Sequence, residues 1–137
     1  LRTPGHSLVK LLAPCAGPAV LVGSYTHPEY SVLMRDVLVA RQMTGLLSRG
    51  LEGEVVCDPR RQPRYDAVWQ GQAYCVAEQQ AGTLAAVPGL PQAIEARTTA
   101  EYTRAVLAGK LPVPQAVAAQ VANITALAQR RIEYKKR

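Results

Sequence analysis

Few side chains in this 137-residue sequence have the types and spacing that catalysis requires. The histidines are His6 and His27, and His27 precedes Pro28 at a predicted helix start, which favours a capping or surface role. The carboxylates are isolated apart from Glu52 and Glu54, which lie in a Gly-rich stretch without the scaffold that a two-carboxylate hydrolytic site needs. No HExxH, GxSxG, GxGxxG or Walker pattern occurs. The sequence therefore predicts no enzyme, no cofactor and no small-molecule substrate.

The cysteines do not indicate a metal site. Cys15, Cys57 and Cys75 are an odd set without CxxC spacing, which argues against a zinc site and against a disulfide framework. We expect buried, reduced thiols, as in a reducing compartment.

Aromatic and basic residues lie close together in one stretch of the chain. Tyr65 and Trp69 follow Arg60, Arg61 and Arg64, and such a set can form a surface on which RNA bases stack. The competing interpretation places Trp69 in the core and the arginines on a solvated loop. We favour the second, because tryptophan is usually largely buried.

Composition allows one compact domain with an aliphatic core. Apolar residues make up 48% of the chain and Phe is absent. These values argue against wholesale disorder, a collagen-like chain and a disulfide-dense scaffold. The most apolar run, 11–23, contains two prolines and is shorter than the roughly 20 residues of a membrane-spanning helix, so no membrane insertion is expected.

The net charge of +6 is concentrated at one end, because residues 130–137 alone carry +4. A basic end of this kind suits contact with phosphates, anionic lipid or an acidic partner. It equally suits a helix C-terminus that complements its own dipole, followed by a solvated tail. The sequence leaves both interpretations open.

The first part of the chain shows the signals of a small mixed sheet with flanking helices. The apolar run 19–25 predicts a buried strand, and Pro28 begins an amphipathic helix that ends near Arg41 or Gln42. Residues 65–76 predict two strands around a Gln70-Gly71 turn, with Ala67, Trp69, Ala73 and Cys75 on one face. A short Ala-rich helix is expected over 77–87.

From Leu90 onward the pattern becomes helical. Leu90, Ile94, Thr98, Tyr102 and Val106 lie four residues apart in a segment rich in helix formers. Gly109 and the Pro112/Pro114 pair interrupt it, and a second amphipathic helix then runs to the basic end. The predicted fold class is thus α/β (α+β), a small mixed sheet with flanking helices plus a C-terminal helical extension. The predicted division is a body over 1–89, with 43–64 as an insertion, and an extension over 90–137.

The order of these pieces resembles the large-subunit ribosomal protein ten family, the L-ten or stalk-base proteins. The resemblance rests on Gly17-Pro18 before a strand, His27-Pro28 before a helix, the hairpin with Gln70-Gly71-Gln72, and Leu84-Ala85-Ala86-Val87-Pro88 before a long C-terminal helix. It covers roughly residues 8–42 and 65–137. No single motif is unique, and the ordered set carries the likeness.

The resemblance implies a structural constituent of the large ribosomal subunit. Such a protein binds ribosomal RNA beside an L-eleven-type protein, and its C-terminal helix anchors L-seven/L-twelve-type stalk dimers that recruit translational GTPases. The ribosomal-RNA candidates are basic residues of the body: Arg2, Lys10, Arg35 and Arg41. The candidates for stalk-protein binding form an apolar stripe: Tyr102, Val106, Leu107, Val113, Val117, Val121, Ile124 and Leu127. The alternative for this stripe is packing onto its own domain.

The sequence also departs from the family pattern. The strand-helix-strand segment that normally precedes the Gly-Pro is not found in this sequence, unless residues 1–7 are its last remnant. Residues 43–64 look like an insertion, and the first residue is Leu1 instead of Met. These departures suggest a mitochondrial version, located in the matrix on the mitochondrial ribosome, and a fragment of a longer chain would show the same departures. A non-catalytic accessory subunit of another organellar assembly, such as a respiratory complex, is the alternative.

Overall fold

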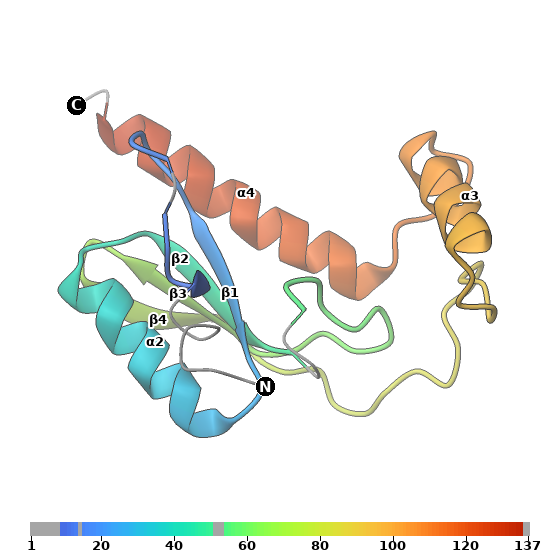
Figure 1. The fold of residues 1–137 in the computed structure, drawn as a ribbon, viewed down its shortest axis with the longest axis horizontal. Helices are drawn as coiled ribbons and strands as arrows, with labels where there is room; N and C mark the ends of the chain where they lie inside the picture. The colour runs from blue at the N-terminus through green and yellow to red at the C-terminus, as the bar shows by residue number, and fades with distance from the viewer. Residues whose placement is uncertain (1–8, 14, 51–53, 136–137) are drawn as a thin grey trace.

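A four-stranded sheet lies between two helices in the computed structural model, which describes residues 9–13, 15–50 and 54–135 (Figure 1). The chain runs through β1 (Leu21–Tyr25), α2 (Pro28–Ala40), β2 (Gly45–Arg49), β3 (Tyr65–Trp69), β4 (Gln72–Ala77), α3 (Ala96–Leu107) and α4 (Gln115–Lys135). The strand order is β1-β2-β3-β4. The β1/β2 pair is parallel and the other two pairs are antiparallel. The predicted α+β class, with its mixed sheet and C-terminal helix, is confirmed.

Each face of the sheet has its own core. On the α2 face, Met34 and Leu38 pack with strand residues that include Leu47 and Val68. On the α4 face, Leu127 packs with Leu46, Tyr65 and Ala67. Neighbouring residues such as 46 and 47 reach opposite cores because side chains alternate across a strand. The core is aliphatic apart from Tyr65 and Trp69, as the composition predicts.

Local signals explain the first helix and the hairpin, and both predictions are confirmed. Pro28 occupies the first turn of α2 after His27, whose side chain makes no capping hydrogen bond. The β3–β4 turn has positive φ at Gln70 (49°) and Gly71 (72°), the geometry of a two-residue turn that matches strand twist. Gly23 lets α2 approach closely, because a Cβ there would lie 2.9 Å from Met34 Cε.

The hairpin side chains that share one face of the sheet differ from those predicted. Ala67 pairs with Tyr74, and Trp69 pairs with Gln72. Cross-strand partners share a face, so Ala67 and Trp69 lie opposite the face of Ala73 and Cys75. The two-residue turn sets this register, and the alternation pattern alone does not reveal it.

The predicted helix over 77–87 is wrong. Residue 77 is the last residue of β4, and residues 78–87 form no helix. The backbone N–H of Gln80 donates to Gln62 O at 3.0 Å, and that of Leu84 donates to Arg60 O at 3.0 Å. Gly82 adopts a positive φ of 73°. The segment therefore bonds across to the 60–62 loop, and its donors are not used in helical turns.

The predicted division of the chain also differs from the structure. Residues 45–49, within the segment expected as an insertion, form β2, which pairs with both β1 and β3. The expected extension over 90–137 includes α4, which covers one face of the sheet. Of the helices α2, α3 and α4, α3 alone stands away from the sheet, at the end of an extended connection (Figure 1). The body therefore needs β2 and α4 to close its sheet and its second core.

Candidate partner-binding surfaces

The residues expected to bind ribosomal RNA do not share one surface role. Arg2 lies outside the described residues. Lys10 Nζ donates a hydrogen bond to the backbone oxygen of Ser24 at 3.1 Å. Arg35 on α2 is exposed and lies 3.4 Å from Asp36 Oδ1. Arg41 caps the C-terminus of α2 and lines a cleft together with Arg131, which sequence reasoning had not selected.

The apolar stripe expected to bind a stalk protein is divided by the fold. Leu107 of α3 is 82% exposed, Val121 of α4 is 55% exposed, and Val113 between the helices is also exposed. Tyr102, Val106 and Val117 are half-buried. Leu127 is buried in the core of this chain, and Ile124 packs against the same cluster. Leu127 and Ile124 are thus occupied by the chain's own sheet.

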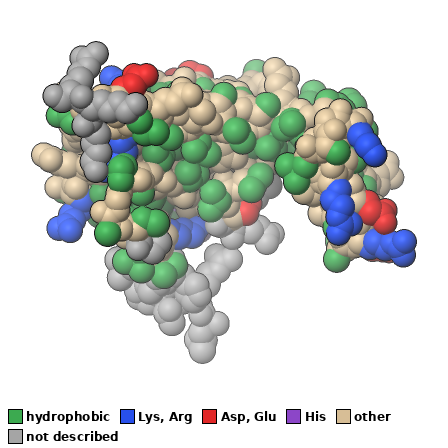
Figure 2. Space-filling model, turned by 90° about the horizontal axis from the view of Figure 1, so that it is seen from above, with side chains coloured by type: hydrophobic (Ala, Val, Ile, Leu, Met, Phe, Trp, Pro, Cys, Tyr) green, Lys and Arg blue, Asp and Glu red, His purple; other side chains and the backbone are tan. Residues whose placement is uncertain are grey.

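The outer face of α4 carries no charge over four turns. No Asp, Glu, Lys or Arg occurs between Gln115 and Gln129, although α4 lies at the surface. Its inner face buries Ala116, Gln120 and Leu127. Its outer face exposes mostly small and apolar side chains, namely Ala118, Val121, Ala122, Thr125, Ala126 and Gln129. Figure 2 shows hydrophobic and uncharged polar atoms across the middle of this side of the molecule.

A second exposed apolar stripe lies on α2. Tyr30, Leu33 and Val37 share one side of the helix and are 39%, 58% and 39% exposed, whereas Met34 and Leu38 are buried. All five belong to the apolar pattern of the predicted amphipathic helix. The apolar stripe of the helix is wider than the strip of helix surface that touches the sheet. The sheet therefore covers Met34 and Leu38 and leaves the side chains at the edge of the stripe exposed.

The described residues around the arginine-rich loop do not form a surface on which RNA bases could stack. Trp69 is 7% exposed, as the favoured interpretation predicts. Arg60 pairs with Asp58 at 2.8 Å, and Arg64 pairs with Asp66 at 2.9 Å. The cation over the Trp69 ring is instead Arg130 of α4, whose guanidinium carbon lies 5.4 Å from the ring centroid. Arg60 and Arg64 are therefore each paired with a carboxylate close to them.

The remaining chemistry-bearing residues do not gather. Cys15 is exposed, Cys57 is buried and Cys75 is half-buried, all as free thiols. Burial raises the pKa of the Cys57 thiol, which makes it a poor nucleophile. Across the described ranges, no three His, Cys, Asp or Glu side chains lie close enough to hold a metal ion. Glu52 lies outside the described residues, so the Glu52/Glu54 pair has no described geometry.

Comparison with known proteins adds a relative without an assigned activity. The chain is 33% identical over 123 residues to a protein of Escherichia coli (strain K12) named "Uncharacterized protein YbiB". The alignment covers 89% of this chain and 38% of the relative. The chain thus spans well under half the length of this relative. No family model matches the chain.

Of the described helices, none is long and apolar enough to cross a membrane.

Proposed function

We propose that this chain is a non-catalytic interaction protein that holds a partner helix on the outer face of α4. The observation that supports the proposal is the uncharged outer face of α4 from Gln115 to Gln129, with Val121 exposed at its centre. A surface helix normally carries charged or strongly polar residues on its solvent side. A contiguous uncharged face on an exposed helix is typical of a protein interface.

The charges around this face indicate what kind of helix would fit. Basic residues begin immediately after it, at Arg130 and Arg131, and the last eight residues carry +4. A partner helix with an apolar stripe followed by acidic residues would match both parts. The small residues Ala118 and Ala122 leave room for its backbone to approach.

In its specific form, the proposal is the one that the resemblance implies. The chain would be a stalk-base subunit of the large ribosomal subunit, in the mitochondrial matrix, with L-seven/L-twelve-type dimers on α4 and ribosomal RNA and an L-eleven-type protein beside the body. Because Leu127 and Ile124 pack on the sheet, the face that would be offered to a stalk protein is the side of Val121. Leu107 on α3 would extend it, since this side chain is 82% exposed.

The test measures whether the purified chain captures a partner, and then whether the Val121→Asp variant captures less of it. We expect the wild-type chain to co-sediment with large ribosomal subunits and to retain an L-seven/L-twelve-type protein in a pull-down. Val121→Asp should weaken this retention at least tenfold, because an unpaired carboxylate would be desolvated in the interface.

The matched control is Val32→Asp on α2, where the side chain is 44% exposed and lies away from α4. Retention should be unchanged by it. Equal retention by wild type and Val121→Asp would contradict the α4 interface. Sedimentation with respiratory-complex membranes, without ribosomal particles, would support the organellar accessory subunit and overturn the ribosomal form.

A further inference from the structure

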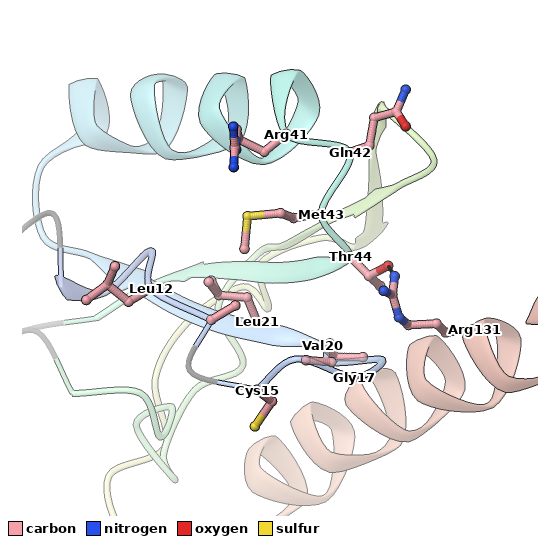
Figure 3. A pocket seen from close by; sticks show the side chains of 12 residues that line it. Leu12, Cys15, Gly17, Val20, Leu21, Arg41, Gln42, Met43, Thr44 and Arg131 are labelled. Carbon is pink, nitrogen blue, oxygen red and sulfur yellow. Dashed lines mark hydrogen bonds between the residues drawn. The ribbon is translucent and has the colours of Figure 1, made fainter.

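A cleft of about 340 Å³ opens at the N-terminal edge of the parallel strands β1 and β2. Its walls come from the segment that leads into β1, from the α2–β2 connection and from Arg131 of α4 (Figure 3). Three parts of the chain that are distant in sequence thus meet around one space. Its volume lies within the range of small-molecule sites, about 300–1,000 Å³.

Two arginines give this cleft a positive charge. Arg41 and Arg131 line it, and no Asp or Glu is among the described residues of its lining. Neither arginine forms an ion pair with any residue that the structure describes. In Figure 3, Arg41 lies on the α2 side and Arg131 on the α4 side, with Met43 and Thr44 between them. An anion placed in this space would be attracted from both sides.

The guanidinium of Arg131 is held in place but incompletely bonded. Its Nη1 donates a hydrogen bond to Thr44 Oγ1 at 2.7 Å. Its Nε is buried and has no hydrogen-bond partner within the described part of the chain. Arg131 as a whole is half-buried, so its charge is only partly removed from water, and an anion in the cleft would be attracted to it. The Thr44 bond fixes the orientation that an anion would meet.

Apolar side chains form the rest of the wall. Leu12, Val20, Leu21 and Met43 line the cleft beside the two arginines. A ligand that fills the space therefore needs a charged end and an apolar body. Small-molecule sites commonly combine an apolar lining with a few polar groups that fix orientation.

We infer that this cleft binds a small phosphate monoester with an apolar or aromatic body, held by Arg41 and Arg131. The net charge of +2 on the lining matches a phosphate monoester, which carries about −1.5 to −2 at pH 7. A carboxylate would balance only one arginine. Planar guanidinium groups also bind phosphate oxygens through paired hydrogen bonds. Arg131 also belongs to the basic end offered to the partner helix, but none of the uncharged residues of the α4 outer face lines the cleft, so the two proposals can fail separately.

The experiment is calorimetric titration of the purified chain with phenyl phosphate, benzoate and inorganic phosphate at physiological salt. We expect saturable binding of phenyl phosphate, and binding at least tenfold weaker for the other two. Benzoate lacks the second charge and inorganic phosphate lacks the apolar body. Equal affinity for benzoate and phenyl phosphate, or no saturable binding of phenyl phosphate, would overturn the inference.

Variants locate the site. Arg41→Met keeps the length of the side chain and removes its charge at an exposed position, so the fold should persist. It should lower phenyl phosphate affinity about tenfold or more. Arg35→Met is the matched control, since it makes the same change on the same helix outside the cleft. Equal losses in the two variants would contradict a specific site.

Two further changes separate the cleft from the α4 interface. Arg131→Lys keeps the charge but loses the planar fork, and should weaken phenyl phosphate binding. Val121 is exposed and is not among the residues that line the cleft, so Val121→Asp should bind phenyl phosphate as the wild type does. Loss of binding in Val121→Asp with an intact circular-dichroism spectrum would contradict the assignment of the site to this cleft.

Discussion

The side-chain oxygen of Gln120 accepts a hydrogen bond from the backbone N–H of Cys57 at 3.0 Å, across 63 positions of sequence. The side-chain nitrogen of the same residue donates to the backbone oxygen of Val55 at 2.7 Å. Gln120 is 4% exposed. One buried carboxamide therefore satisfies two backbone groups of the segment after β2 and ties that segment to α4.

Gln120→Ala should destabilise the protein by about 2 kcal/mol, because the buried backbone N–H of Cys57 and the partly buried backbone oxygen of Val55 both lose their partner. The measurement is the free energy of unfolding from urea denaturation. Gln129→Ala on the exposed side of the same helix is the control and should change it by less than about 0.5 kcal/mol. Similar effects of the two substitutions would contradict the clamp.

Leu127→Ala should cost about 2–5 kcal/mol of stability, because it leaves a cavity in the core between α4 and the sheet. Val121→Ala should change stability by less than about 0.5 kcal/mol, since the side chain already faces solvent. The comparison is made by thermal and urea unfolding of both variants. If Leu127→Ala were as stable as Val121→Ala, α4 would not pack as described.

Arg130→Ala should alter the emission of Trp69, the single tryptophan of the chain. Arg130 lies over the ring and donates a hydrogen bond to the Tyr74 hydroxyl at 3.0 Å, while Tyr134 contacts the ring edge-on. Loss of the cation–π contact should also lower stability by about 0.5–1 kcal/mol. The control, Arg97→Ala on α3, should leave emission at the wild-type wavelength and intensity; an identical shift in both would contradict the contact.

Stability should fall as the pH rises above about 9. Burial raises the pKa of the Tyr65 hydroxyl, and the neighbouring Cys57 thiol raises it further. Burial likewise raises the pKa of Cys57. In the unfolded chain a tyrosine hydroxyl loses its proton near about pH 10 and a cysteine thiol near about pH 8.5, while the folded chain retains both protons. The unfolded state then binds fewer protons, so the free energy of unfolding decreases with pH.

Tyr65→Phe retains the buried ring and removes the titrating hydroxyl. Its free energy of unfolding should therefore decline less steeply than that of the wild type between about pH 9 and about pH 11. This window surrounds the tyrosine pKa of the unfolded chain, which is about 10. Urea unfolding at a series of pH values measures this slope. Parallel profiles for the two proteins would show that Tyr65 does not contribute.

The elements with strong local signals could be predicted from the sequence. A proline after a polar residue begins α2, an apolar run forms β1, and Gln70-Gly71 forms the turn between β3 and β4. These outcomes depend on the conformations of a few adjacent residues. The failed helix over 77–87 shows the opposite case, because its backbone donors bond to residues some twenty positions earlier.

The two surfaces show the same division. The absence of charge between Gln115 and Gln129 is a property of the sequence, and so is the amphipathic pattern of α4. Which side of the helix is buried is decided by the sheet, which takes up Leu127 and leaves Val121 outside. Of the cleft, the sequence indicated Arg41 as a basic candidate and placed Arg131 in the basic end, but it did not show that the two residues meet.

The sequence by itself determined the local elements, the aliphatic character of the core and the concentration of positive charge at the end. Only the tertiary structure decided that β2 joins the sheet, that α4 covers its second face, and that Arg41 and Arg131 share a cleft. The physical reason is range: turns and helix starts depend on neighbouring residues, whereas strand pairing and burial depend on contacts between residues far apart in the chain.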